Sequence, residues 1–410
     1  MFKWLDTENS QNLSRETVDS DTLGSMRSDE HQYFRPGRVA ESASAKRSIE
    51  SFSRPAIFIL LFFLALNLGQ SQAQVQGSPS DEYPAKRWKQ LAKPEDRGWS
   101  TERLAAAKAY ADSLDTAAVI VVDDGIIVSQ WGATATQFNV HSIRKSFLSA
   151  LYGIATAKGQ IELNATLDQL GIDDNEPSLT PEEKQARVVD LLKARSGIYH
   201  AALYETPAMK AEKPARGSHP PRTFWCYNNW DFNALGTIYE KLTHDSIYHA
   251  FDAQIAQRIG MEDYDPKEQN YVIGSDSIHR AYPFRMTARD MARFGLLYLK
   301  GGRWHDQQLI PAQWVKDSTT AYSIADGNAR DSYSGYGYLW WIAANGNHYP
   351  HVEVPDGSFS AWGAGGHFIA VIPALNIVVV HRVNTDDPAK KVTLEQFGEL
   401  LRLILAAKKR

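Results

Sequence analysis

The chain has 410 residues, of which 43% are hydrophobic and 22% charged, so it can bury a sizeable globular core. Its formal net charge of -4 argues against the basic face that is typical of nucleic-acid-binding proteins. A single cysteine, Cys226, excludes an intramolecular disulfide framework and a cysteine-based zinc site.

The start of the chain differs in character from the rest. Residues 1–46 are polar and lack apolar periodicity, and we expect a disordered leader. Residues 47–73 combine a basic flank, an apolar run at 56–66 and a small-residue tripeptide ending at Ala73, which is the pattern of a secretory signal peptide. We expect cleavage after Ala73, and the alternative is a retained short anchor with transient membrane contact through residues 55–68. Either interpretation predicts an exported protein, periplasmic or secreted.

A helix and a hairpin are expected near the beginning of the folded part. Residues 74–100 are polar with scattered Pro and Gly, and they indicate a linker or surface wrap. The apolar spacing over 103–114 is typical of a helix. Two apolar runs, 117–122 and 126–132, flank an Asp-Gly pair, which supplies the positive φ that a tight β-hairpin turn requires. A strongly apolar helix is then expected over 142–157.

Helices dominate the middle of the chain and strands return near its end. Thr287 is a plausible N-cap, with Asp290 in a capping-box-like position. Helices are expected at 188–193, 230–242, 247–259, 287–299 and 394–406, and strands at 338–343, 367–372 and 376–383.

Strands at both ends, with helices between them, predict an α+β fold in which one antiparallel sheet is flanked by helices and joined to a helical subdomain. We expect a single catalytic domain over 101–410, with sheet parts at about 101–157 and 335–410 and a helical part at about 158–334.

Ser142 and Lys145 form the only S-x-x-K sequence in the chain. Residues three apart on a helix lie on one face, so the hydroxyl and the amine are expected to meet. A serine hydroxyl is a poor nucleophile until a base takes its proton, and a lysine amine can do so when burial or nearby cations lower its pKa. Taken alone, the motif fits a surface serine and a solvated lysine equally well.

Two further residues lie before the helix predicted at 230–242. Tyr227 can shuttle a proton, and Asn229 can hydrogen-bond a substrate amide while holding Lys145 in place. The chain has no G-x-S-x-G, H-E-x-x-H or GxGxxG sequence, and its histidines lack metal-ligand spacing. We therefore expect neither a cofactor nor a metal.

These motifs together resemble the penicillin-recognising serine hydrolases, on the branch that includes class C β-lactamases, D-Ala-D-Ala peptidases, β-lactamase-like esterases and 6-aminohexanoate-dimer hydrolases. S-x-x-K matches Ser142 and Lys145, and Y-x-N matches Tyr227 and Asn229. The resemblance covers about residues 100–405. It implies an acyl-enzyme on Ser142, with Lys145 and Tyr227 moving the proton. Flanking stretches are also similar, at 188–198, 286–304, 336–341 and 359–373.

The third family motif departs from the penicillin-active members. Trp362-Gly363-Ala364 resembles the W-G-G variant of the esterase-like members and lacks the lysine of Lys-Thr-Gly, which argues against β-lactamase activity. A backbone N–H near Ala364, together with that of Ser142, would form an oxyanion hole. His367 is a candidate for partly replacing the missing positive charge, although a buried sheet histidine is the simpler interpretation.

The sequence thus predicts a serine hydrolase that cleaves a small ester, amide or peptide, with no nucleic-acid partner and an undetermined oligomeric state. One alternative is a β-lactamase or D-Ala-D-Ala carboxypeptidase. Another is a catalytically silent sensor or binding domain on a membrane anchor, which has no use for the pair Lys145 and Tyr227. Cys226 lacks a nearby histidine, and Arg222 stands where similar proteins often have glycine, so the sequence gives neither residue a role.

Overall fold

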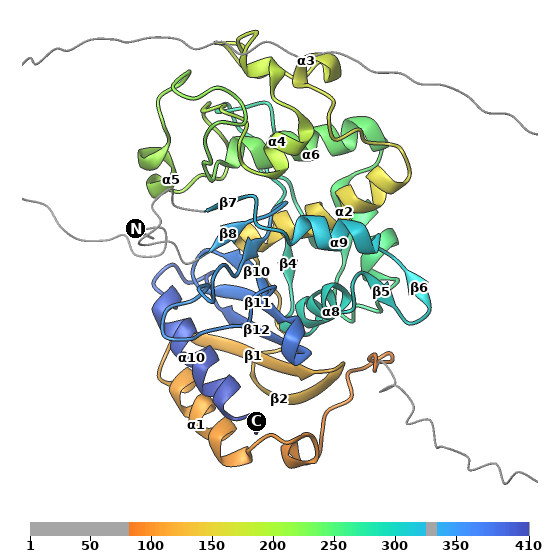
Figure 1. Cartoon of the computed structure of the whole chain (residues 1–410), viewed down its shortest axis with the longest axis vertical. Coiled ribbons are helices and arrows are strands. Elements are labelled where there is room, and N and C mark those ends of the chain that lie inside the picture. Colours follow the sequence, from red (N-terminus) through yellow and green to blue (C-terminus); the bar gives the residue numbers. More distant parts are fainter. Residues whose placement is uncertain (1–81, 325–333, 410) are drawn as a thin grey trace, which may run out of the picture. The chain divides into compact units, whose positions relative to one another are not determined.

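The computed structural model describes residues 82–324 and 334–409 (Figure 1). The predicted leader at 1–46 and signal segment at 47–73 lie outside these residues, as does the start of the predicted linker at 74–100. The described part of that linker runs beside a sheet strand, where the Leu91 N–H donates to the Ile127 carbonyl at 2.9 Å. Within the ranges that the structure describes, no helix has the length and apolar character needed to cross a membrane.

An eight-stranded antiparallel sheet lies at the centre of the fold, in the order β2-β1-β12-β11-β10-β9-β8-β7. Strands from the two ends of the chain meet where β1 pairs with β12 and Val121 faces Val379. The predicted α+β fold with one antiparallel sheet is therefore confirmed. The strands are β1 (Thr116–Asp123), β2 (Ile126–Gly132), β7 (Ser323–Ile324), β8 (Gly335–Tyr336), β9 (Trp341–Ile342), β10 (Phe359–Gly363), β11 (His367–Ile372) and β12 (Ile377–Val383).

Helices cover both faces of this sheet (Figure 1). The ring of Phe397 in α10 (Leu394–Ala406) stacks on Phe368 of β11 at 4.0 Å, and α10 also packs against α1 (Thr101–Asp112). On the other face, Gly295 of α8 (Ala288–Leu299) lies against Ile369 and Val378. Since neighbouring strand residues point to opposite faces, Phe368 and Ile369 place these helices on opposite sides.

Helix α2 (Arg144–Ala157) is almost wholly buried and contacts α6 (Asn229–Thr243), α7 (Ile247–Phe251) and α9 (Ala312–Ser318). The turn at 141–143 that precedes it contacts β10 and β11, so the start of α2 lies between the sheet and the helical part of the chain. The other helical elements are η1 (Pro94–Arg97), η2 (His141–Ile143), α3 (Leu167–Leu170), η3 (Glu183–Gln185), α4 (Val188–Leu192), α5 (Pro207–Glu212), η4 (Asp252–Ala256), η5 (Pro266–Glu268) and η6 (Pro373–Leu375). Two small two-stranded sheets complete the fold: β3 (Phe138–Asn139) pairs with the distant β4 (Arg285–Met286), and β5 (Arg303–Trp304) forms a hairpin with β6 (Gln307–Gln308).

Several elements differ from the sequence predictions. The helix predicted at 247–259 ends at Phe251 and continues as the π-helical segment η4. The strand predicted at 338–343 is reduced to β9, because Leu339 adopts a left-handed φ of 64° that interrupts an extended backbone. Helix α8 lies in the segment assigned to the helical subdomain but packs on β11 and β12, so it belongs to the sheet part.

The start of α8 forms only half of the predicted capping box. The Thr287 hydroxyl accepts from the Asp290 N–H at 3.3 Å, as expected. The Asp290 carboxylate, however, accepts from the backbone N–H groups of Glu262 and Asp263 at 2.6 and 3.0 Å. The carboxylate thus ties a neighbouring loop to the helix rather than closing the helix on itself.

Candidate active site

Ser142 and Lys145 meet at the start of α2. Ser142 lies in the short η2 turn that leads into the helix, and Lys145 follows in its first turn. The Lys145 amine is hydrogen-bonded to the Ser142 hydroxyl, with 2.7 Å between Nζ and Oγ. This is the contact that the three-residue spacing predicts.

The surroundings of Lys145 favour an uncharged amine. The side chain is 2% exposed, and Nζ lies 4.8 Å from the centre of the Tyr227 ring and 4.9 Å from that of Phe232. No carboxylate among the described residues lies within ion-pair distance. Burial, and secondarily the positive charge of Arg144, holds the pKa of Lys145 well below its ordinary value. The amine can therefore accept the Ser142 proton.

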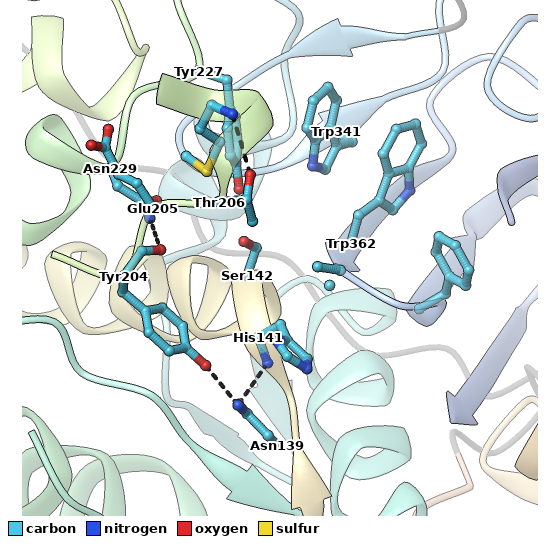
Figure 2. A pocket seen from close by; sticks show the side chains of 14 residues that line it. Asn139, His141, Ser142, Tyr204, Glu205, Thr206, Tyr227, Asn229, Trp341 and Trp362 are labelled. Atoms are coloured by element: carbon cyan, nitrogen blue, oxygen red, sulfur yellow. Dashed lines mark hydrogen bonds between the residues drawn. The ribbon is translucent and has the colours of Figure 1, made fainter. Parts of the chain in front are cut away.

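Tyr227 reaches the same hydroxyl from a distant part of the chain. Its phenol is hydrogen-bonded to the Ser142 side chain, and Figure 2 shows it pointing toward Ser142. Burial raises the pKa of Tyr227, so the phenol keeps its proton at neutral pH. Its ring stacks on Trp341 at 5.4 Å, which fixes the direction of the hydroxyl.

Asn229, the first residue of α6, presents an unused acceptor. Its Nδ2 donates to the Tyr204 carbonyl at 2.5 Å, while its buried Oδ1 has no hydrogen-bond partner among the described residues. Asn229 lines the same cavity as Ser142. The predicted hydrogen bond from Asn229 to Lys145 is not formed, because the amide group is turned toward Tyr204.

The third motif forms one wall of the cavity. Trp362 stacks on Trp341 with 4.4 Å between ring centres and 13° between planes. A Cβ on Gly363 would lie 2.4 Å from the Val140 carbonyl, so only glycine allows β10 to approach the Ser142 turn this closely. Ala364, half-buried, follows at the cavity edge. The oxyanion hole proposed for its N–H stays a prediction.

His367 is fully buried and does not line the cavity. Its Nδ1 accepts from Arg382 Nε at 2.9 Å, and its Nε2 lies 3.1 Å from the Thr385 hydroxyl. Burial, together with the Arg382 charge, keeps the pKa of His367 well below its ordinary value. His367 is therefore uncharged and supplies no positive charge to the site.

The residues around Ser142 enclose a cavity of about 380 Å³ (Figure 2). The sequence analysis gives a role to six of the 14 residues that line this cavity. It missed His141, although this residue precedes Ser142, and it missed Tyr204, which no local pattern marked. The cavity is lined by Asn139, His141, Ser142, Tyr204, Glu205, Thr206, Met209, Tyr227, Asn229, Trp341, Trp362, Gly363, Ala364 and Phe368.

Neither of the two residues without a predicted role takes part in this chemistry. Burial raises the pKa of Cys226 to about 12, so the thiol stays protonated at neutral pH. Arg222 has a left-handed φ of 78°, which is the conformation that glycine adopts without strain. Across the ranges described, no three His, Cys, Asp or Glu side chains gather in a way that could hold a metal ion.

Comparisons with known proteins found one matching family model and several proteins of similar structure. A family model described as Beta-lactamase matches residues 102–401. A putative 6-aminohexanoate-dimer hydrolase from Bacillus anthracis is 22% identical, with 80% of this chain and 88% of that chain covered and a TM-score of 0.57. EstCE1, a hydrolase with promiscuous acyltransferase activity, is 12% identical, with coverage of 75% and 97% and a TM-score of 0.55.

Two further relatives extend the comparison. A penicillin-binding protein homologue from Pyrococcus abyssi is 17% identical, with coverage of 75% and 77% and a TM-score of 0.54. An uncharacterized protein of Alkalihalophilus pseudofirmus is 19% identical over 298 residues, which is 66% of this chain and 84% of that protein. At these identities the solved structures show that they share the fold of this chain.

Proposed function

Because the chain belongs to the Beta-lactamase family, whose members are mostly serine hydrolases, we propose that it cleaves a small ester or amide through an acyl-enzyme on Ser142. The observation that carries this proposal is the meeting of three groups. The Ser142 hydroxyl is hydrogen-bonded both to the buried Lys145 amine and to the Tyr227 phenol. A nucleophile with a base and an acid in contact is the arrangement that covalent catalysis requires.

The steps follow from these contacts. Ser142 Oγ attacks the substrate carbonyl carbon while its proton passes to Lys145. The oxyanion of the tetrahedral intermediate is stabilised by the N–H groups of Ser142 and Ala364, a role worth about 3–4 kcal/mol per donor in the activation energy. The tetrahedral intermediate then collapses, and the leaving group takes a proton that is relayed from Lys145 through Tyr227. In the second step, water attacks the acyl carbonyl carbon and gives its proton to Lys145 through Tyr227. Lys145 returns the proton to Ser142 Oγ as the acyl group leaves.

The cavity lining supports an uncharged substrate. None of the lining residues is a lysine or arginine, and aromatic side chains form one wall. The charged lining residue, Glu205, is paired with Lys213 at 2.5 Å. A substrate carboxylate, such as that of a penicillin or a peptide C-terminus, would meet no cation in this lining. The unused Asn229 Oδ1 suits a substrate N–H, which favours amides and amide-bearing esters.

Hydrolysis of two chromogenic substrates by the full-length chain, beside the Ser142→Ala variant, tests the proposal. We expect turnover of p-nitrophenyl acetate that the substitution abolishes, and no comparable turnover of nitrocefin. Ester turnover that survives the substitution removes Ser142 from the mechanism. Nitrocefin turnover dependent on Ser142 would instead favour the β-lactamase alternative, and inactivity on both would favour a silent binding domain.

Export is a second part of the proposal, supported by the signal-like segment at 47–73. Expression of the full chain in a bacterium with two membranes, followed by N-terminal sequencing of the periplasmic protein, tests it. A mature start directly after Ala73 is the expected result. A chain that keeps residues 55–68 and stays with the membrane fraction would show the anchor alternative.

A further inference from the structure

A chain of hydrogen bonds runs from a buried arginine to the cavity edge. Arg382 Nε donates to His367 Nδ1 at 2.9 Å, and His367 Nε2 lies 3.1 Å from the Thr385 hydroxyl. The same hydroxyl lies 2.8 Å from Nε2 of His141. Arg382 and His367 are fully buried, whereas His141 lines the cavity directly before Ser142 (Figure 2). None of these groups has a part in the proton transfer described above.

Arg382, the donor at the buried end, fixes the direction of every hydrogen bond in this series. A guanidinium has no acceptor, so His367 Nδ1 must accept, and an uncharged His367 then carries its proton on Nε2 and donates to Thr385. The Thr385 hydroxyl has a single proton and no other hydrogen-bond partner among the described residues. It therefore donates to His141 Nε2, which leaves the proton of an uncharged His141 on Nδ1.

His141 is uncharged at neutral pH. Burial, followed by the positive charge of Arg382, lowers the pKa of His141 to about 4. An imidazole that carries one proton, with Nε2 accepting, offers a single donor at a known atom. His141 Nδ1 has no hydrogen-bond partner among the described residues.

The backbone of His141 is itself held in place by neighbouring residues. His141 has a left-handed φ of 49°, a conformation that is strained for a residue with a Cβ. Its N–H donates to Asn139 Oδ1 at 3.0 Å, and Asn139 Nδ2 donates to the Tyr204 hydroxyl at 2.6 Å. Strained residues of this kind persist where the surrounding structure over-determines them, as it does here.

We propose that His141 is a substrate-binding residue whose Nδ1–H donates to a second carbonyl oxygen of the substrate, away from the bond that is cleaved. Thr385 and Arg382 act as positioning residues that set its tautomer. The inference rests on the proposed function and narrows its substrate class to uncharged esters or amides that carry another carbonyl group. A fixed, uncharged donor matches such an oxygen in a lining that has no lysine or arginine.

Substrate pairs that differ by one carbonyl test the binding role. The full-length chain is assayed with p-nitrophenyl pentanoate and 4-oxopentanoate, and with the hexanoate and 5-oxohexanoate. We expect kcat/KM to favour an oxo ester by up to about tenfold, the scale of one net hydrogen bond. In His141→Ala this ratio of kcat/KM values is expected to fall to about one. Damage to the fold would instead lower kcat/KM for both substrates and leave their ratio unchanged. A ratio of one in a wild type with Ser142-dependent turnover, or a ratio unchanged in His141→Ala, overturns the proposal.

Nitrogen-15 NMR of histidine-labelled full-length protein tests the tautomer without turnover. His381 Nδ1 lies 2.6 Å from the Gly366 carbonyl, so it must carry a proton and provides an internal reference, and His367 provides the Nε2–H reference. We expect His141 to be uncharged at pH 7 with its proton on Nδ1, and to become a tautomer mixture in Thr385→Val. A proton on Nε2 of His141 in the wild type contradicts the inference.

Binding can be followed in the same spectra when the nucleophile is absent. Ethyl 4-oxopentanoate, added to the Ser142→Ala variant, is expected to shift the His141 Nδ1 resonance, and ethyl pentanoate is not. Equal shifts, or none, would count against His141 as a donor to the substrate. Since this measurement needs no catalysis, it separates failure of this inference from failure of the proposed hydrolase.

Discussion

The amine of Lys145 lies 2.7 Å from the hydroxyl of Ser142, which precedes it by about one helical turn. No carboxylate among the described residues forms an ion pair with this amine. An unpaired amine that is 2% exposed is costly for the fold, since burial disfavours its charged form. The same burial produces the uncharged base that the chemistry needs. Stability and catalysis therefore make opposite demands on this residue.

Replacing Lys145 by methionine separates these demands. We expect Lys145→Met to lower kcat/KM by about 10²–10⁴, the usual contribution of a general base. In the wild type, Lys145 takes up a proton when the chain unfolds at pH 7, and this proton uptake favours the unfolded state. The methionine variant lacks this contribution, so its free energy of unfolding at pH 7 should exceed that of the wild type. Urea unfolding at several pH values measures this difference, which should shrink as pH rises toward 10.5, where the unfolded lysine also loses its proton. A variant less stable than the wild type at pH 7 would contradict this account.

The lowered pKa of Lys145 also predicts the pH dependence of the rate. As pH falls through this lowered pKa, the amine gains a proton and can no longer accept that of Ser142, so kcat/KM should fall. The ascending limb should therefore lie well below the ordinary lysine pKa of 10.5. Lys145→Arg keeps a positive charge that cannot be removed, and it should show little activity at any pH. An ascending limb that persists in Lys145→Arg would assign it to another group.

The Tyr227 phenol should matter most when the leaving group is poor. Tyr227→Phe keeps the ring that stacks on Trp341 but removes the hydroxyl, and we expect a fall in kcat of about 10²-fold or more for ethyl esters. The loss should be smaller for p-nitrophenyl esters, whose leaving group needs less help from an acid. Tyr336→Phe is a matched control, because its ring packs edge-on against Tyr227 and does not line the cavity. Equal losses for both leaving groups would show that Tyr227 does not protonate them.

The sequence predicted local elements well where one strong pattern decided them. The Asp-Gly pair gave the β1–β2 hairpin, the S-x-x-K spacing gave the Ser142–Lys145 contact, and the last helix spans 394–406 as expected. The prediction that Tyr227 lies beside Ser142 and Lys145 came only from the resemblance to a family. Nothing in local periodicity places a residue at 227 beside one at 142.

Features that depend on contacts between distant residues were missed. His141 was overlooked because its role depends on Thr385, which is far away in the sequence. The amide of Asn229 turns toward the carbonyl of Tyr204, a residue with a left-handed φ of 65° that lies 25 positions earlier in the chain. For His367 the simpler interpretation, a buried sheet histidine, is the correct one, and the hydrogen bond that Arg382 donates to it is a contact that no local pattern marked.

Gly363 illustrates a contact that can be tested by one methyl group. In Gly363→Ala the new Cβ would lie 2.4 Å from the Val140 carbonyl, so β10 or the Ser142 turn must shift. A displacement on the order of 1 Å can cost about 10²-fold in rate, and we expect a loss of that size in kcat/KM. Gly217→Ala is the control: no atom lies within 4 Å of its new Cβ, and the cost of a Cβ at its left-handed φ of 76° falls on a residue that does not line the Ser142 cavity. Similar kinetics for the two variants would show that the close approach at Gly363 is unimportant.

The covalent intermediate is the most direct test of the account. The full-length chain is mixed with p-nitrophenyl acetate, quenched in acid within the first turnover, digested and analysed by mass spectrometry. We expect an acetyl group on Ser142 in the wild type and more of it in Tyr227→Phe, with none on the corresponding peptide of Ser142→Ala. Ser142-dependent hydrolysis with no acyl group on Ser142 at any quench time, or an acyl group on another residue, would contradict the central claim.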